Sequence, residues 1–456
     1  MDVKEIVIRQ RSYFHSGATL PVPYRKAALK KLKKCIEKNE GEIAKAIRAD
    51  LGKSGFESYM CETGMVLSEI SYMLKHIDQL SKEKRVMTPI AQFSSRSYQK
   101  PSPYGVVLIM SPWNYPFMLS IDPLVDAIAA GNTAIIKPSA YSPKTSELIA
   151  KIIRECFAEE YVAVVTGGRA ENQALLNEHF DYIFFTGSQA VGKEVMRKAA
   201  EHLTPVTLEL GGKSPCIVTK EANIRLAAKR IVFGKYLNLG QTCVAPDYIY
   251  VERSVKSAFI REVKHQICKQ YGRAPLHNPN YGKMVNEKHF NRVRSLIDQK
   301  KVIYGGEMSA EKQKIAPTVM DEVDFSDAIM QEEIFGPVMP ILTFDSVEEV
   351  VEKLHSMASP LALYIFTENK EEADYVLSNC KFGGGCVNDT IIHLATTGMG
   401  FGGVGESGMG AYHGKKGFDT FTHYKSIVDK KTWIDLPMRY APYRKIYDKL
   451  IHLFLR

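Results

Sequence analysis

Three side chains with complementary chemistry lie in short motifs of this chain: Cys243 in GQTCVAP, Glu209 in VTLEL and Asn114 in SPWNYP. A cysteine thiolate can attack a carbonyl carbon, and an amide N–H can stabilise the oxygen that becomes negative in that attack. A carboxylate can then take a proton from water. Together the three groups have the chemistry needed for a covalent reaction at a carbonyl carbon.

Each of these residues also has an ordinary structural interpretation. A free cysteine most often fills space in a core, and a glutamate near the end of a buried strand often forms a salt bridge. An asparagine between prolines can simply shape a rigid turn. The position of each residue relative to the predicted strands and helices must therefore be considered next.

The chain from Tyr104 to Leu210 alternates short apolar runs with amphipathic segments. The apolar runs predict five strands with four helices between them: GVVLIM, TAIIKP, YVAVV, YIFFTGS and PVTLEL. This alternation is typical of a doubly wound parallel sheet with helices on both faces. Ligands of such sheets bind beyond the carboxyl ends of the strands, where Asn114 and Glu209 lie.

A second series of alternating segments follows Gly211. It contains the predicted strands PCIVT, DYIYVE, VMPILTF and LALYIFT, and a helix that we expect to end at Leu239. Cys243 lies between that helix and the strand DYIYVE. The pattern predicts a second α/β domain, and the polar segment KEKRVMTPIAQFSSRSYQKPSP before the first sheet predicts a hairpin arm.

Small and cationic residues at the strand ends indicate a nucleotide site. Gly187 and Ser188 form the turn before a predicted helix, where a diphosphate could approach the backbone amides of the helix N-terminus. Lys137 follows the second strand and suits a ribose hydroxyl or a phosphate. The structural alternatives are an ordinary tight turn and an exposed lysine.

Composition excludes several classes of protein. Charged residues interrupt the first ten positions and no run approaches 20 apolar residues, so we expect neither a signal peptide nor a membrane span. The eight cysteines show no CxxC pair or metal-ligand spacing, which favours a reduced, cytoplasmic protein without a metal site. The net charge of +9 comes from dispersed basic residues, so nucleic acid is not an expected partner.

The motif series resembles that of the aldehyde dehydrogenase superfamily. The motifs, in chain order, are PWNYP, KPS, FTGS, LELGGKSP, GQTCVAPDY, EEIFGPV and FGGVGESGMG. The segment GAYHGKKGFDTFTH resembles the class 3 branch, which includes fatty aldehyde dehydrogenases, and the resemblance extends to about Ser426. It implies NAD(P)-dependent oxidation of aldehydes to carboxylic acids, with medium- or long-chain aliphatic or aromatic aldehydes as substrates.

The resemblance also implies a domain organisation. An NAD(P)-binding domain would comprise residues 1–82 and 101–210, and an α/β catalytic domain would comprise residues 211–396. A bridging or oligomerisation arm and C-terminal tail would comprise residues 83–100 and 397–456. By analogy with class 3 relatives, the arm implies a homodimer.

The resemblance implies a role for each candidate residue. Cys243 would form a thiohemiacetal and then a thioester, and Glu209 would activate the water that hydrolyses the thioester. The Asn114 amide and the Cys243 backbone N–H would form the oxyanion hole. The residues that would contact NAD or NADP are Trp113, Lys137, Gly187, Ser188, Leu210, Gly211, Glu333 and Phe335.

One position departs from the pattern of relatives that prefer NAD. These relatives often carry a glutamate three residues after the lysine, where this chain has Ala140. Because an acid there favours the ribose 2′-hydroxyl and repels a 2′-phosphate, we expect NADP to be accepted alongside NAD. The alternative is that Ala140 has no effect because Lys137 and Glu333 already hold the ribose.

Three other functions are alternatives to aldehyde oxidation. A CoA-acylating enzyme, a cysteine hydrolase and a non-catalytic structural protein could share parts of this pattern.

The segment RKIYDKLIHLFLR predicts an amphipathic helix of about 20 Å, too short to cross a bilayer. Its apolar face, formed by Ile446, Leu450, Leu453 and Phe454, would pack on its own domain or a partner subunit, cover the aldehyde entrance, or contact lipid peripherally.

Overall fold

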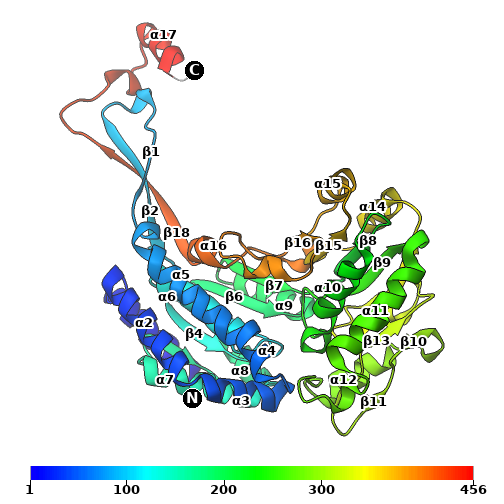
Figure 1. Ribbon diagram of the computed structural model, residues 1–456. Helices are drawn as coiled ribbons and strands as arrows, with labels where there is room; N and C mark the ends of the chain where they lie inside the picture. The colour runs from blue at the N-terminus through cyan, green and yellow to red at the C-terminus, as the bar shows by residue number, and fades with distance from the viewer. Residues whose placement is uncertain (1, 455–456) are drawn as a thin grey trace.

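Two sheets, each covered by helices, form the body of the molecule, and a narrow arm extends away from it (Figure 1). The computed structural model describes the backbone of residues 2–454 and the side chains as far as His452, so the predicted apolar positions Leu453 and Phe454 lie outside the described side chains. No helix among residues 2–454 is long and apolar enough to cross a membrane.

The first sheet has six strands in the order β17-β7-β6-β3-β4-β5. Their bounds are β3 (Val106–Met110), β4 (Thr133–Lys137), β5 (Val162–Val164), β6 (Tyr182–Gly187), β7 (Val206–Leu210) and β17 (Gly408–Met409). The pairs from β7 to β5 are parallel, which confirms the five strands predicted from the apolar runs. All five residues of β3 are buried because helices cover both faces of this sheet.

Helices connect and cover these strands. The connecting helices are α6 (Met118–Ala130), α7 (Pro143–Cys156), α8 (Arg169–Leu176) and α9 (Gln189–Ala200). The N-terminal helices are α1 (Val3–His15), α2 (Val22–Lys38), α3 (Glu40–Leu51), α4 (Gly55–Ser58) and α5 (Gly64–Leu80), with a π-helical turn at Tyr59–Thr63 between the last two. Every residue of α6 is buried, so this helix lies at the centre of the first unit.

The second sheet has seven strands in the order β10-β13-β14-β9-β8-β15-β16. Their bounds are β8 (Pro215–Val218), β9 (Tyr248–Glu252), β10 (Val302–Tyr304), β13 (Thr318–Met320), β14 (Val338–Phe344), β15 (Ala362–Phe366) and β16 (Gly384–Val387). A separate pair is formed by β11 (Met308–Ser309) and β12 (Lys314–Ile315). The helices are α10 (Ile224–Tyr236), α11 (Lys256–Tyr271), α12 (Glu287–Ser295), α13 (Ala328–Gln331), α14 (Val347–His355) and α15 (Lys370–Asn379).

Helix α10 ends three residues earlier than the sequence predicts. It stops at Tyr236, whereas we expected Leu239. The backbone of Asn238 and Leu239 is left-handed, with φ of 50° and 53°, and a right-handed helix cannot continue through such residues. The expected end was wrong because the apolar periodicity of the segment does not encode this change of hand.

The predicted hairpin arm is confirmed. Strand β1 (Lys84–Val86) pairs antiparallel with β2 (Ser95–Pro103), and β18 (Thr422–Lys430) pairs with β2 along its whole length. At the tip, α17 (Lys445–Phe454) lies beside the hairpin and far from the body (Figure 1). The helix is therefore not packed on the body of its own chain.

Part of the C-terminal region returns to the first sheet before it enters the arm. Strand β17 pairs antiparallel with β7, so that Gly408 lies opposite Glu209. The following helix, α16 (Gly414–Thr420), packs against α5 and α6. Residues 408–420 thus lie against the unit that we assigned to the cofactor, while the domain boundaries themselves stay a prediction.

Candidate active site

Cys243 is placed by a turn with an uncommon backbone. Asn238, Leu239 and Gly240 are left-handed in succession, the last with φ of 69°. A side chain at Gly240 would collide with the carbonyl oxygen of Gly336, so glycine is required for close approach as well as for conformation. The turn therefore brings the GQTCVAP loop against the loop that carries Phe335.

A cavity of about 280 Å³, which we call the strand-end cavity, opens at the carboxyl ends of β3, β6 and β7. It joins most of the predicted site residues, from both α/β units. Those that line it are Trp113, Asn114, Gly187, Ser188, Glu209, Leu210, Gly211, Cys243, Glu333 and Phe335. Lys137 is the predicted site residue that does not line it.

Asn114 is held by three polar contacts. Its side-chain amide donates to the carbonyl oxygen of Gln241 at 3.0 Å, two residues before Cys243. Its own carbonyl oxygen accepts from Lys53 Nζ and from Asn238 Nδ2, each at 2.8 Å. Within residues 2–454 only one of the two amide hydrogens is used in this way, so the other can be donated to a ligand in the cavity. The turn-forming role and the chemical role of Asn114 are thus compatible.

Glu209 is buried, and no partner for it is found in the described part of the chain. Neither carboxylate oxygen has a hydrogen bond or an ion pair among the described residues, so the salt-bridge alternative is wrong. Burial raises the pKa of Glu209 well above its usual range. A carboxyl group with a raised pKa beside a ligand cavity is suited to general-base chemistry near neutral pH.

The Cys243 thiol is protonated in this environment. Burial, with smaller contributions from Glu333 and Glu209, raises its pKa to about 12. Burial, followed by the charge of Asp247, also raises the pKa of Glu333 to about 8. The thiol must therefore lose its proton to a base when it reacts, because the thiolate is the nucleophilic form.

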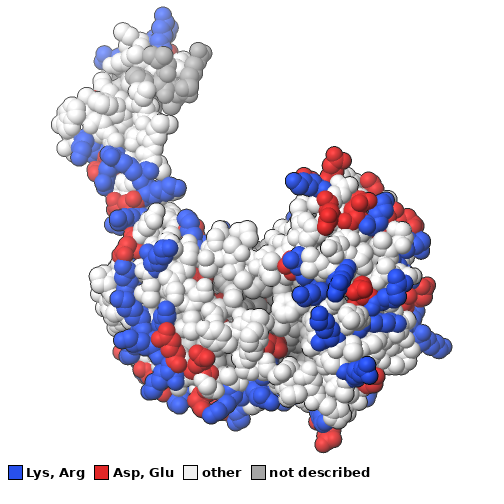
Figure 2. Space-filling view, viewed as in Figure 1, with Lys and Arg blue, Asp and Glu red and all other residues white. Residues whose placement is uncertain are grey.

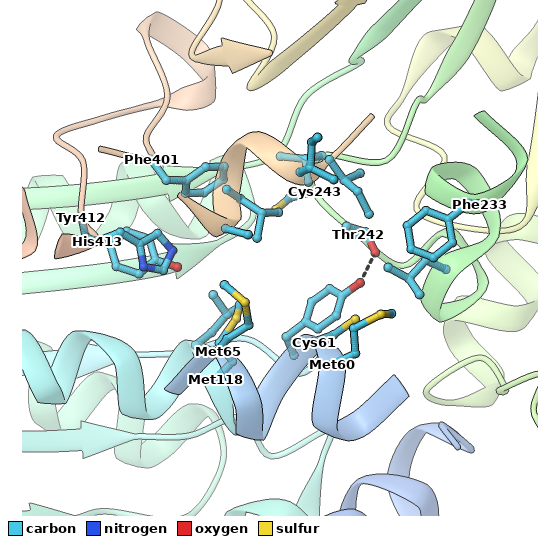
Figure 3. A pocket seen from close by; sticks show the side chains of 18 residues that line it. Met60, Cys61, Met65, Met118, Phe233, Thr242, Cys243, Phe401, Tyr412 and His413 are labelled. Carbon is cyan, nitrogen blue, oxygen red and sulfur yellow. Dashed lines mark hydrogen bonds between the residues drawn. The ribbon is translucent and has the colours of Figure 1, made fainter. Parts of the chain in front are cut away.

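A second cavity, of about 180 Å³, meets the strand-end cavity at Cys243 and Leu119; we call it the apolar cavity. Figure 3 shows Met60, Cys61, Met65 and Met118, from the N-terminal helices and α6, on the side of the cavity opposite Cys243. The remaining lining residues are Tyr115, Leu119, Phe233, Leu237, Thr242, Val244, Ile391, Ile392, Leu394, Ala395, Phe401, Tyr412 and His413. Cys243 thus lies between the strand-end cavity and a mainly apolar one.

Lys137 lies apart from the strand-end cavity. Its amine donates to the carbonyl oxygens of Pro138 and Gly167, at 3.0 and 2.7 Å. Burial lowers the pKa of Lys137, and the negative charge of Glu171 partly opposes this shift. Glu171 also accepts a hydrogen bond from the backbone N–H of Gly168. An acid therefore lies near this lysine even though the position three residues after it is Ala140.

Six residues that line the strand-end cavity were not among the predicted site residues: Pro112, Leu119, Thr186, His289, Arg292 and Glu332. The ring of His289 lies 4.9 Å from that of Trp113, and Arg292 donates to the carbonyl oxygens of Glu333 and Ile334 at 3.1 and 2.7 Å. The spacing of three between His289 and Arg292 predicts a shared helix face. No pattern in the sequence indicates that this face meets the strand-end cavity.

Comparisons with known proteins identify the family of this chain. A model of the aldehyde dehydrogenase family matches residues 1–427. A 4,4'-diaponeurosporen-aldehyde dehydrogenase of Staphylococcus aureus is 47% identical over 436 residues, which are 95% of each chain. A dog protein named dimeric NADP-preferring aldehyde dehydrogenase is 43% identical over 443 residues, which are 96% of this chain and 98% of the relative.

A solved structure extends the agreement to the fold and the cofactor. The crystal structure of an indole-3-acetaldehyde dehydrogenase with NAD+ superposes with a TM-score of 0.86 at 30% identity, over 93% of this chain and 88% of that one. The chain therefore belongs to the aldehyde dehydrogenase family, which confirms the prediction of an enzyme that oxidises aldehydes with NAD or NADP.

Proposed function

We propose that Cys243, Asn114 and Glu209 carry the aldehyde through two covalent intermediates on the cysteine. Cys243 attacks the aldehyde carbon, and the oxygen of the thiohemiacetal accepts hydrogen bonds from the Asn114 amide and the Cys243 backbone N–H. Glu209 then takes a proton from the water that hydrolyses the thioester. The observation that supports this most directly is the Glu209 carboxyl group, which has no partner among residues 2–454 and lines the cavity that also holds the thiol.

The cofactor site fits a dinucleotide. Ser188 precedes α9 without a side-chain cap hydrogen bond, so the first backbone N–H groups of this helix are available to a pyrophosphate. A side chain at position 211 would collide with the Glu333 carboxyl group, so glycine keeps this space open. We assign Trp113, Gly187, Leu210 and Phe335 to the same site as lining residues. When bound there, NAD or NADP supplies the hydride acceptor of the reaction.

The substrate is proposed to be an apolar aldehyde of medium or long chain, or an aromatic one. The apolar cavity reaches Cys243 and offers few polar groups to a substrate. The Staphylococcus aureus relative is named for 4,4'-diaponeurosporen-aldehyde and the structural relative for indole-3-acetaldehyde. Such substrates gain roughly 0.8 kcal/mol per buried methylene group, which favours longer chains over short ones.

The cofactor prediction tests this function directly. We expect the purified protein to reduce both NAD and NADP with a long-chain aldehyde, and Ala140→Glu to raise the ratio of kcat/KM for NAD over NADP by about tenfold, because a second carboxylate repels the 2′-phosphate. Absorbance of the reduced cofactor measures both rates. An Ala158→Glu variant, remote from Lys137 in the sequence, serves as the control for added charge. Absence of any turnover with NADP in the unmodified protein would contradict the prediction.

We also propose that the chain forms a homodimer through the arm and works in the cytoplasm. Strand β18 has one unpaired edge in the three-stranded arm sheet, which is a ready template for pairing. Met87 and Ile446, near the arm tip, are 93% and 73% exposed. A relative is named dimeric, and the eight free cysteines are consistent with a reducing compartment.

The apolar side of α17 provides the test. We expect Ile446→Asp to raise the dimer dissociation constant at least tenfold, because a charge replaces an apolar side chain at the contact, and light scattering over a dilution series measures it. Ile8→Asp on α1, also exposed, is the matched control. Flotation with anionic vesicles tests the alternative that α17 binds lipid and not a partner subunit. An unchanged dimer together with loss of vesicle binding would contradict a subunit contact and support a peripheral membrane role.

A further inference from the structure

Asn238 joins the two loops that must cooperate at the thiol. Its side-chain Nδ2 donates to the carbonyl oxygen of Asn114 at 2.8 Å and to that of Gln241 at 3.1 Å. Gln241 belongs to the loop of Cys243, whereas Asn114 belongs to the loop after β3. Both hydrogens of the Asn238 amide are used, so this side chain links the two α/β units at the site.

The contacts converge on a single acceptor. The carbonyl oxygen of Gln241 accepts from both Asn238 Nδ2 and Asn114 Nδ2, the latter at 3.0 Å. An oxygen with two lone pairs is then fully used, and the rotation of the Asn114 amide is restricted. The orientation of the proposed oxyanion donor thus depends on a residue that does not itself line either cavity at Cys243.

The backbone of Asn238 is held in a conformation that suits few residues. It is left-handed, and among residues with a side chain asparagine and aspartate adopt this region most readily. Its N–H donates to Glu57 Oε1 at 2.9 Å, and its carbonyl oxygen accepts from Gln241 Nε2 at 3.0 Å. The residue is buried, and the turn is fixed from both sides.

We propose that Asn238 is a positioning residue, which orients the Asn114 amide toward the oxygen that becomes negative. Asn238 contacts neither the aldehyde nor the cofactor in this role. Its loss lowers kcat and leaves the KM values for aldehyde and cofactor within about twofold, because binding surfaces are unchanged. A displacement of about 1 Å in such a group costs about 10²-fold in rate.

Two substitutions separate the amide from the backbone. Asn238→Gly removes the side chain and keeps the left-handed turn, and Asn238→Asp keeps both the turn and the shape but loses the N–H donors. We expect both variants to lower kcat about 10²-fold. Asn238→Asp should also lower the thermal unfolding midpoint, because its buried carboxylate would face two carbonyl oxygens, so Asn238→Gly is the variant that separates positioning from stability. Asn223→Gly is the control, because it removes an asparagine side chain at the start of α10, far from the thiol along the chain. There the Asn223 side chain accepts a hydrogen bond from the Leu226 backbone N–H.

A double variant tests the proposed route through Asn114. Asn114→Ala alone is expected to lower kcat about 10²–10³-fold. If Asn238 acts by positioning that amide, Asn114→Ala with Asn238→Gly is no slower than Asn114→Ala alone. Multiplied losses in the double variant would overturn the proposal, as would a kcat of Asn238→Gly within twofold of the unmodified protein. Either outcome leaves aldehyde oxidation by the unmodified protein intact.

Discussion

A Glu209→Gln variant is expected to give one rapid burst of reduced cofactor per active site and then to stall. Glutamine preserves the shape of the side chain but cannot take a proton from water, and a general base contributes about 10²–10⁴ in rate. The thioester on Cys243 still forms when position 209 carries no charge. The acyl group therefore accumulates on the cysteine. Stopped-flow absorbance measures the burst, and peptide mass measures the adduct on Cys243.

The pH dependence of deacylation is a second test of the role of Glu209. Because burial raises the pKa of Glu209 well above its usual range, the deacylation rate should increase as the pH rises through that raised value. The increase should be absent in Glu209→Gln, which has no group to deprotonate at this position. Only the unprotonated carboxylate can accept the proton from water, which sets the sign of the effect.

Controls for Glu209 distinguish hydrolysis from acyl transfer. Cys243→Ala should show neither burst nor adduct, because no nucleophile remains. Full steady-state turnover by Glu209→Gln without CoA would contradict the assignment of the base. Rescue of the stalled variant only by added CoA would identify a CoA-acylating enzyme instead.

A Lys53→Met variant should lose about 3–5 kcal/mol of unfolding free energy. Lys53 and Glu62 form an ion pair of 2.7 Å in which both side chains are fully buried. Glu62 also accepts from the backbone N–H of Phe117, at 2.9 Å, near the start of α6. Removal of the lysine charge leaves this carboxylate buried and unpaired, which is the costly way to break a buried pair.

The same substitution should reduce activity, because Lys53 also donates to the carbonyl oxygen of Asn114 at 2.8 Å. Denaturation by urea measures stability and steady-state kinetics measure activity. Lys45→Met is the matched control, since the pair of Lys45 with Glu42 is exposed and its loss is expected to leave the unfolding free energy almost unchanged. Equal losses from both substitutions would show that the buried pair has no special role.

Several features of the site followed from short stretches of sequence. Continuous apolar runs predicted the five parallel strands, because strands covered on both faces need apolar side chains at every position. The carboxyl ends of these strands then placed Asn114, Ser188 and Glu209 at one edge of the sheet, as the structure shows. The arm was also predicted, since polar segments with extended patches have little tendency to join a buried sheet.

Other features depended on contacts between distant segments. Glu209 could have formed a salt bridge in VTLEL, and only the packing around β7 leaves its carboxyl group without a partner among the described residues. The missed residues His289 and Arg292 reach the site because α12 packs toward Trp113. Local periodicity encodes the face of a helix but not the element that this face will meet.

The sequence by itself predicted the candidate chemical groups, the five parallel strands of the first sheet and the edge of that sheet at which we propose the nucleotide site. Tertiary structure decided the register between the two units, the left-handed turn at Asn238 and the apolar cavity, whose walls come from residues 60–65, 115–119, 233–244 and 391–413. The physical reason is that hydrophobic periodicity acts over a few residues. A cavity or a shared acceptor such as the Gln241 carbonyl exists only after segments far apart in the chain have packed together.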